Sequence, residues 1–556
     1  MILSSRSLPE EPALSAAICI IGAGAAGITL ACELDGTDLA VTLLEAAGIG
    51  WGGGVSQDPY QGSAVAPHPN PANFRRRAFG GSTTIWGGRC VPFDPIDFER
   101  RDYVPNSGWP ISYQEVARHY PKAMAYCDAG AFEFTVGTAL ANPRPILPGL
   151  EGDADIDGDM IERYSLPTDF GTRYRDRLAR STNIRVVTHA QVLRLEKEPG
   201  GDRIAAALFR TPSGRTGRVE ARAFVLALGG IETTRLLLVS DGAGNGLGNR
   251  SDCLGRYYAC HVENVIGVLR PRRGGVVFHF EKTRDGVYGR RKLHIRAAAQ
   301  RREGLRNIAF RLHYPDVSDP RHRSPVLSAV YLAKRTLIPE YRRILQHGAA
   351  DAVPGAALRH FTNVALGLPA LAGFGVHYLG RRLLARRKLP YVLVANPDGS
   401  YPIEFNSEQT PSPASRITLN GDRDAYGVPR VHVDWRFNED DIDSIARAYR
   451  LLRDRLSRIG TAVVEFDDAT LRERIARSQP VGGHHLGTTR MAGSPATGVV
   501  DKDCAVFGLP NLYLASASVF PTSSHANPTL TIVALAIRLA QHLVARFGAR
   551  HGGPYG

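Results

Sequence analysis

Cysteine is scarce in this chain, and its few residues follow no metal or disulfide pattern. The seven cysteines are odd in number, widely spread, and include no Cys-x-x-Cys pair. A disulfide framework and a structural zinc site are therefore not expected, and no metal-ligand set is predicted. This cysteine usage fits a reducing compartment best.

Signatures of nucleic-acid binding, secretion and repetition are also missing. The net charge is +14, but the basic residues are scattered and no helix-turn-helix, zinc-finger or RNA-binding motif accompanies them, so we expect no nucleic-acid partner. Glu10 and Glu11 precede the first apolar run, which does not fit a signal peptide or a twin-arginine leader. There is no internal repeat or low-complexity stretch. A cytoplasmic protein is therefore expected.

Length, by contrast, is ample. A chain of 556 residues exceeds the size at which one hydrophobic core stops growing, so at least two lobes are expected. The 58 glycines, about a tenth of the chain, suit close approaches of backbone to a ligand.

The N-terminal region carries the pattern of a dinucleotide-binding βαβ unit. Residues 16–21 predict a buried strand, residues 28–34 a helix and residues 41–44 a second strand. Between the first strand and the helix, residues 22–27 read Gly-Ala-Gly-Ala-Ala-Gly, which allows a tight turn and leaves helix N–H groups free for phosphates. Glu45 follows the second strand at the spacing expected for a carboxylate that binds an adenosine ribose. This order of elements predicts a bound dinucleotide.

Three further segments fit the same lobe. Residues 79–88 read Phe-Gly-Gly-Ser-Thr-Thr-Ile-Trp-Gly-Gly, whose backbone N–H groups could press against a flat heterocycle; an ordinary surface loop is the alternative. Residues 183–195 alternate as a pair of neighbouring strands should. Residues 223–230 predict a buried strand that runs through a Gly-Gly turn into a helix over 231–239.

The middle of the chain, from about 261 to 475, changes character. It has no glycine fingerprint, but it has β-like runs at 262–269 and 427–435 and a helical pattern over 440–459. Because the motifs of the first lobe and of the C-terminal region flank this block, the second lobe is predicted to be an insertion.

One stretch of this middle block combines apolar and basic residues. Residues 361–380 are mostly apolar, and a cluster of arginines follows. This arrangement is typical of an interfacial membrane element, and a buried or lid helix pair is the alternative. The cluster comprises Arg381, Arg382, Arg386, Arg387 and Lys388, and the residues that argue against a membrane-spanning helix are Asn363, Pro369 and His377.

Two motifs near the C-terminus carry chemistry. Residues 483–491 read Gly-His-His-Leu-Gly-Thr-Thr-Arg-Met, and residues 524–531 read Ser-His-Ala-Asn-Pro-Thr-Leu-Thr. Oxidation of an alcohol carbon requires a neutral base within hydrogen-bond reach of the hydroxyl, and histidine has a suitable pKa. Together with the N-terminal motif, these segments resemble the glucose-methanol-choline (GMC) flavin oxidoreductases, in particular bacterial sugar dehydrogenases and pyranose oxidases.

The resemblance implies an α/β fold, in which a Rossmann-like FAD-binding domain carries an inserted α+β substrate domain built on an antiparallel sheet. The FAD-binding domain is expected in three parts, 14–125 with a flavin-contacting loop at 79–98, then 183–260 and 476–547. Residues 126–182 are expected to connect the parts, and residues 261–475 to form the substrate-binding domain.

The resemblance also implies FAD as the cofactor. Where some sugar-oxidising relatives hold a histidine joined to FAD, this chain has Ile85, so non-covalent binding is expected. Ser516 stands where many relatives have Asp or Gly near the flavin phosphates. The residues expected to bind the cofactor are Gly22, Gly24, Ala26, Gly27, Glu45, Gly80, Gly81, Ser82, Thr83, Val192, Ser516, Asn527, Pro528 and Thr529.

By the same resemblance, His484 takes the place of the catalytic base and Asn527 that of its partner. Asn527 with Pro528 also has the pattern of a helix N-cap followed by proline. His485 and His525 are expected to face the substrate or to support the site.

The sequence thus predicts FAD-dependent oxidation of a CH–OH group of a sugar, glycoside or polyol. A hydrophobic or lipid-like alcohol taken at a membrane surface is one alternative, and a catalytically idle flavoprotein subunit is another. A flavin monooxygenase is less well supported, because its chemistry does not need the His–Asn pair. The electron acceptor, O2, a quinone or a protein, stays open.

Overall fold

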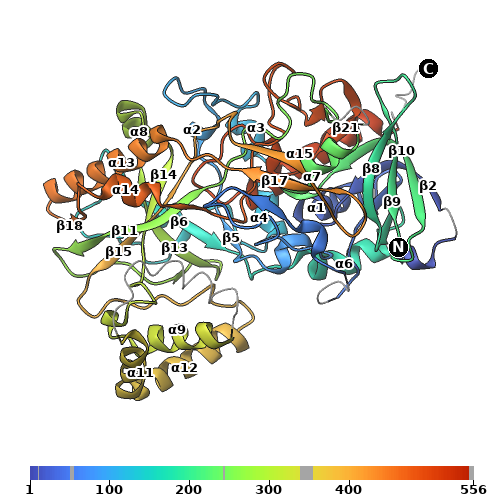
Figure 1. Cartoon of the computed structure of the whole chain (residues 1–556). Helices are drawn as coiled ribbons and strands as arrows, with labels where there is room; N and C mark the ends of the chain where they lie inside the picture. Colours follow the sequence, from blue (N-terminus) through green and yellow to red (C-terminus); the bar gives the residue numbers. More distant parts are fainter. Residues whose placement is uncertain (10–11, 51–54, 242–244, 338–354, 550–556) are drawn as a thin grey trace, which may run out of the picture.

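Two large β-sheets organise the chain (Figure 1). A computed structural model describes residues 1–9, 12–50, 55–241, 245–337 and 355–549. Each of the two sheets has nine strands, and each is surrounded by its own hydrophobic core. A smaller third sheet consists of β16 (Arg416–Arg423), β17 (Pro429–Asp434) and β4 (Gly62–Ala64), in this order.

The first sheet is mostly parallel, as the resemblance predicts. Its path runs β1-β7-β3-β2-β10-β21-β20, and every neighbouring pair is parallel except the last. The central strands are mostly apolar, and their C-terminal halves are buried, because both faces of a parallel sheet are covered. The bounds are β1 Ile2–Ser4, β2 Ala13–Ile21, β3 Val41–Leu44, β7 Ile184–Thr188, β10 Thr216–Leu226, β20 Ala505–Val506 and β21 Leu509–Leu514, with β8 Gln191–Lys197 and β9 Ile204–Arg210 attached through β10.

Helices α1 (Ala25–Leu34), α7 (Gly229–Val239) and α15 (Thr529–Phe547) follow the glycine motif, the Gly-Gly turn and the Asn-Pro motif. Helix α15 packs against α1 and α4 (Tyr120–Tyr126), and α6 (Phe170–Arg180) also packs against α1. Among the described residues α15 alone is long and apolar enough to cross a bilayer, but more than half of its apolar window is buried here. It is therefore a core helix of this lobe.

The second sheet is antiparallel. Its path runs β18-β11-β15-β14-β13-β6-β5, with β12 beside β13 and β19 beside β11. The bounds are β5 Arg89–Cys90, β6 Ile156–Tyr164, β11 Val262–Pro271, β12 Glu281–Lys282, β13 Tyr288–Ile295, β14 Ile308–Leu312, β15 Tyr401–Ser407, β18 Ala462–Glu465 and β19 Gln479–Pro480. Further helices are α2 Pro95–Phe98, α3 Tyr113–Ala117, α5 Val136–Ala139, α8 Ala297–Glu303, α13 Glu439–Arg458 and α14 Leu471–Ala476.

The strands show how the chain passes between the lobes. β5 lies in the stretch assigned to the flavin-contacting loop, β6 in the stretch 126–182 and β19 beyond residue 475, yet all three join the antiparallel sheet. The predicted domain boundaries stay a prediction, and the chain crosses between lobes more often than they imply. No long apolar run marks these crossings, so the sequence pattern did not indicate them.

Secondary structure was largely predictable where apolar residues repeat. The helix over 440–459 is confirmed as α13, whose buried positions include Ile442, Ile445 and Tyr449. The predicted helix over 231–239 begins two residues earlier, at Gly229. The strands within 183–195 are confirmed as β7 and β8, but they pair with other strands and not with each other. The short edge strand β1 was not predicted.

Residues 361–380 form two short helices and not one span. α11 (Ala356–Leu366) and α12 (Leu368–Tyr378) meet at Gly367 and are followed by a short π-helix, Leu379–Leu384. With α9 (Pro325–Leu337) they project from the antiparallel lobe, at the lower left of Figure 1. The alternative of a buried helix pair is wrong, because α12 has no buried residue, and the alternative of a lid helix pair stays a prediction.

Candidate active site

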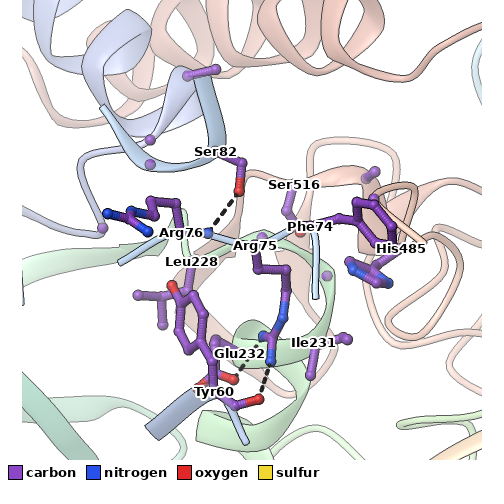
Figure 2. Close-up of a pocket in the computed structure, with 18 of the residues that line it drawn as sticks. Tyr60, Phe74, Arg75, Arg76, Ser82, Leu228, Ile231, Glu232, His485 and Ser516 are labelled. Carbon is purple, nitrogen blue, oxygen red and sulfur yellow. Dashed lines mark hydrogen bonds and ion pairs between the residues drawn. The ribbon is translucent and has the colours of Figure 1, made fainter. Parts of the chain in front are cut away.

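A deep cavity of about 1090 Å³ lies between the two lobes. The glycine motif, the loop over 81–89, the start of α7, the His loop and the start of α15 all contribute to its wall. Figure 2 shows part of this wall, where the Arg75 guanidinium donates to Glu232 at 2.9 Å and to the Tyr60 carbonyl at 2.9 Å. Segments far apart in the sequence therefore meet around one ligand-sized space.

Three helix N-termini open onto this cavity. Helices α1, α7 and α15 each begin without a side-chain cap, and residues of their first turns line the wall. The first N–H groups of a helix have no partner within the helix and carry partial positive charge, which favours a bound phosphate. This arrangement fits the pyrophosphate of a dinucleotide.

The glycines of residues 22–27 act in two different ways. Gly22 has φ +104°, and a Cβ on Gly27 would come within 1.9 Å of the Gly22 carbonyl oxygen, so both are needed for the turn and for close helix packing. Gly24, in contrast, has no atom within 4 Å of a Cβ position and lines the cavity. The predicted contact residues Gly22, Gly24 and Ala26 line the wall, whereas Gly27 lies behind it.

Glu45 lies at the wall beyond the end of β3. Its carboxylate accepts hydrogen bonds from the backbone N–H groups of Ala23 and Ala47, each at 2.8 Å. Burial raises the pKa of this carboxyl group. Each oxygen keeps a free lone pair that could accept from a ribose hydroxyl. Its predicted role stays a prediction that this geometry permits.

The second glycine-rich loop contributes to the cavity only in part. Gly81, Ser82 and Thr83 line the wall, as does the exposed side chain of Ile85. Gly80 does not: a Cβ there would meet the Asp169 carboxylate at 2.5 Å, so this glycine packs against the start of α6. The other predicted cofactor residues that line the wall are Val192, Ser516, Asn527, Pro528 and Thr529.

The predicted catalytic pair is in contact. Nδ2 of Asn527 donates to Nε2 of His484 at 3.1 Å, and both side chains line the cavity. Oδ1 of Asn527 is buried without a hydrogen-bond partner. Helix α15 has Pro528 at its N-cap and no side-chain cap, so the alternative role of Asn527 as a helix cap is wrong. Its side chain is turned toward His484 instead.

His261, which the sequence did not indicate, determines the tautomer of His484. Nε2 of His261 lies 2.8 Å from the Ser523 carbonyl, which can only accept, so Nε2 carries the proton. Nδ1 of neutral His261 is then an acceptor, and it lies 2.6 Å from Nδ1 of His484. His484 must therefore hold its proton on Nδ1. This leaves Nε2 unprotonated, with a lone pair that accepts from Nδ2 of Asn527 at the cavity wall.

Electrostatics keep His484 in this neutral form. Burial lowers the pKa of His484 well below its usual value, and His261, Arg89 and His485 lower it further. Burial also lowers the pKa of His261, to about 4. A neutral imidazole whose Nε2 carries no proton is the form that a general base needs.

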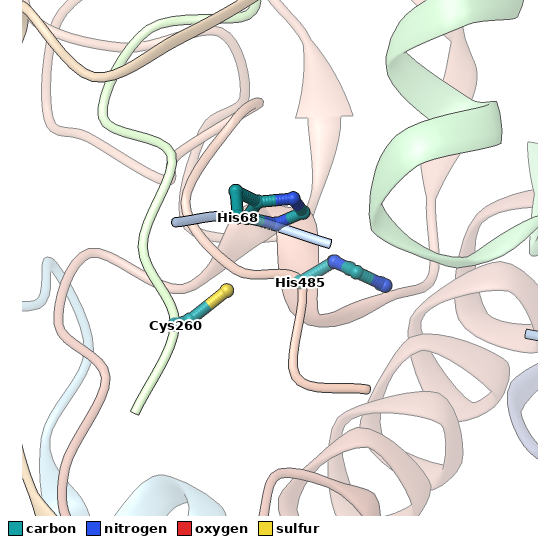
Figure 3. A group of neighbouring side chains, drawn as sticks. All are labelled: His68, Cys260 and His485. Atoms are coloured by element: carbon teal, nitrogen blue, oxygen red, sulfur yellow. The ribbon is translucent and has the colours of Figure 1, made fainter. Parts of the chain in front are cut away.

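His485 belongs to a different network. Its Nδ1 lies 2.7 Å from the Tyr258 hydroxyl, which also contacts Nε2 of His68 at 2.8 Å and Sγ of Cys260 at 3.3 Å. Figure 3 shows how closely His68, Cys260 and His485 approach one another. Because all three share one phenol oxygen, we interpret the group as a hydrogen-bond cluster that supports the cavity wall.

His525 does not face the cavity. It is fully buried, and its Nε2 lies 3.1 Å from Nζ of Lys292 and 3.2 Å from the Asp94 carboxylate. The loop therefore turns Asn527 toward the cavity and His525 toward the interior. The predicted substrate contact of His525 is not seen.

Comparison with known proteins agrees with this geometry. The family model described as GMC oxidoreductase matches residues 411–536. The chain is 25% identical over 521 residues to 2-methyl-1,2-propanediol dehydrogenase of Mycolicibacterium austroafricanum, covering 84% of this chain and 81% of the relative. It is 23% identical to the fructose dehydrogenase large subunit of Gluconobacter japonicus, covering 96% and 98%. Residues 411–536 therefore belong to the GMC oxidoreductase family.

Other known proteins match a part of the chain or its fold. C-glycoside 3-oxidase of Microbacterium trichothecenolyticum is 34% identical over 128 residues, which are 22% of this chain and 23% of that one. The crystal structure of pyridoxine 4-oxidase from Mesorbium loti has the same fold, with a TM-score of 0.51, 19% identity and coverage of 94% and 98%. The chain is thus an oxidoreductase that acts on CH–OH donors, in a family for which FAD is typical.

We expect Glu45→Ala to weaken FAD binding, because a charge-assisted hydrogen bond contributes about 1.5 to 3 kcal/mol. Titration of the apoprotein with FAD, followed by flavin fluorescence, measures the change. Glu45→Gln is the matched control, since its amide oxygen retains one acceptor and it should lose less affinity. If both variants bind FAD with the affinity of the wild type, Glu45 does not contact the cofactor.

Asn527→Ala should slow flavin reduction by about 3- to 10-fold, the equivalent of one ordinary hydrogen bond. Because Asn527 does not cap α15, the unfolding free energy should fall by less than the ~1 kcal/mol of a lost N-cap. Stopped-flow reduction and urea unfolding of the same preparation test both. If the unfolding free energy falls by ~1 kcal/mol and the rate of flavin reduction does not change, Asn527 has a purely structural role.

Proposed function

We propose that this GMC oxidoreductase oxidises a CH–OH group of a sugar, glycoside or other polyol to a carbonyl. The observation that carries the proposal is the wall that the antiparallel lobe places beside His484. That wall is polar and charged, and it includes Arg89, Glu263, Asn264 and Gln479. Such donors and acceptors suit several hydroxyl groups. Nη2 of Arg89 is buried and has no hydrogen-bond partner among the described residues, and a lipid-like alcohol would leave it so.

The names of two relatives point the same way. The fructose dehydrogenase subunit aligns over nearly the whole chain, and the C-glycoside 3-oxidase has the higher identity over a shorter segment. Both names denote enzymes that oxidise a sugar or a glycoside. They support a polyhydroxy substrate for this chain without specifying which one.

His484, Asn527 and His261 have different roles in removing the hydroxyl proton. A substrate hydroxyl between His484 and Asn527 would donate to Nε2 of His484 and accept from Nδ2 of Asn527. When Nε2 takes the hydroxyl proton, His484 becomes positively charged, and Nδ1 of His261 accepts the hydrogen bond that stabilises this form. Bound FAD supplies the two-electron acceptor for the hydride that leaves the carbinol carbon. The product is the corresponding carbonyl compound.

Anaerobic mixing of the purified holoenzyme with a panel of compounds tests the substrate class. Bleaching of the flavin absorbance by sugars, glycosides or polyols, but not by long-chain alcohols or sterols, is the expected result. Bleaching by apolar alcohols alone would favour the lipid-like alternative. A flavin that no CH–OH compound reduces, although dithionite does, would indicate an idle subunit.

We expect FAD to be bound without a covalent link, because Ile85 at the cavity wall has no nucleophilic atom. Precipitation of the protein with acid should release all flavin absorbance into the supernatant. Yellow colour that remains in a washed pellet would show a covalent bond through another residue.

A further inference from the structure

The helices α11 and α12 project from the body of the protein and pack mainly on α9 (Figure 1). The inner side of α11 is held by His360, whose Nδ1 lies 3.0 Å from the Ser328 hydroxyl, and by Asn363, which donates to the Pro320 carbonyl at 2.9 Å. The far end is fixed by Arg387, which donates to the carbonyls of Asp128 and Tyr164. The segment 355–388, here named the docking hairpin, is therefore an ordered projection.

The outer side of the docking hairpin is apolar to a degree that no other described surface matches. Seven of the thirteen exposed large hydrophobic side chains in the described residues lie on it. Their exposed fractions reach 82%, and soluble proteins rarely gather such side chains without a binding role. The seven are Leu358, Phe361, Leu366, Leu368, Val376, Leu379 and Leu384.

The charges of the same segment have one sign. The sequence from residue 355 to residue 397 contains no Asp or Glu. Arg359, Arg381, Arg386 and Lys388 are exposed, and no carboxylate in the described part of the chain forms an ion pair with them. Side chains of this kind can contact phosphates while neighbouring leucines enter an apolar phase.

We infer that the docking hairpin binds the surface of an anionic phospholipid bilayer. Apolar side chains on a projecting helix pair, with unpaired cations among them, match acyl chains and phosphate headgroups in one interface. A protein partner is less well matched, because the surface is a projection and not a groove, and it offers cations without any carboxylate. The net charge of +14 adds attraction at longer range.

Flotation of the purified full-length protein with vesicles tests this inference. The protein should float with phosphatidylglycerol vesicles and stay in solution with phosphatidylcholine vesicles. The triple variant Arg359→Gln, Arg381→Gln, Arg386→Gln should partition on the order of 100-fold less at low salt, since each cation near an anionic surface contributes roughly a factor of five. Phe361→Ser with Leu366→Ser, at exposed positions, should also lose binding.

The matched control removes the same charge from the lobe of the parallel sheet. Arg180→Gln, Arg222→Gln, Arg250→Gln changes three exposed arginines far along the chain from the docking hairpin and should float like wild type. If both triple variants lose vesicle binding equally, the binding depends on net charge alone, and the inference is overturned. Absence of wild-type flotation would overturn it too. Self-association that Leu366→Ser abolishes, without vesicle binding, would assign the surface to a second copy of the chain.

Discussion

Replacing His484 with alanine is expected to slow flavin reduction by ~10² to 10⁴, the range for loss of a positioned general base. The effect should fall mainly on this step, because Nε2 of His484 faces the cavity. Among the described residues its side chain has hydrogen bonds only with Asn527 and His261, which both belong to the site. Anaerobic stopped-flow mixing of the holoenzyme with a competent alcohol measures it. Flavin content and melting temperature should remain close to wild type.

His485→Ala is the control that separates the two adjacent histidines. This variant loses only the hydrogen bond between His485 and the Tyr258 hydroxyl, at the wall of the cavity. Its rate of flavin reduction should therefore change far less than that of His484→Ala. If His485→Ala is the slow variant and His484→Ala reduces its flavin normally, the base is the second histidine. If both variants react like wild type, a His base does not act in this enzyme.

The parts of the site that the sequence predicted are those whose partners lie close along the chain. The turn over 22–27, the strands beside it and Glu45 form one continuous unit, so their order alone specifies the geometry. His484 and Asn527 were predicted from two compact motifs, and each reaches the same cavity. The polar wall of the antiparallel lobe was not predicted, because it depends on how β5, β11 and β19 come together.

His261 shows most clearly why the remainder could not be predicted. It is 223 residues from its partner His484, and it lies just before an apolar strand where a lone histidine carries no motif. Its role depends on the Ser523 carbonyl, in yet another segment. Only the folded chain brings these three groups together.

Sequence patterns gave wrong predictions where the same pattern is compatible with two different structures. Asn527 followed by Pro528 is typical of a helix cap, but contact with His484 determines the side-chain direction instead. His525 is two residues from Asn527 and lies in the interior, beside Lys292. The apolar run over 361–380 resembles a core helix pair, and only its position outside both cores shows that its outer face is exposed.

His261→Leu should slow flavin reduction by about 10- to 100-fold, the scale for groups that orient a functional side chain. Leucine fills the space but offers no acceptor to Nδ1–H of His484, so the proton can move to Nε2 and block the base. His261→Gln retains a neutral acceptor and should recover most of the rate. A purely structural role would not distinguish these two variants, provided that their melting temperatures agree.

The pH profile of the same step tests the charge at position 261. In the wild type, burial and the neighbouring His261 and Arg89 lower the pKa of His484, so the rate should stay constant as pH falls through ~6.5, the ordinary histidine value, and decline only below it. In His261→Glu, a carboxylate beside Nδ1 favours the imidazolium and raises the pKa of His484. The protonated base cannot accept a proton, so the rate of this variant should fall as pH drops through the raised pKa and recover at higher pH. A flat profile in His261→Glu, with its fold and flavin content intact, would mean that position 261 does not contact the base during catalysis.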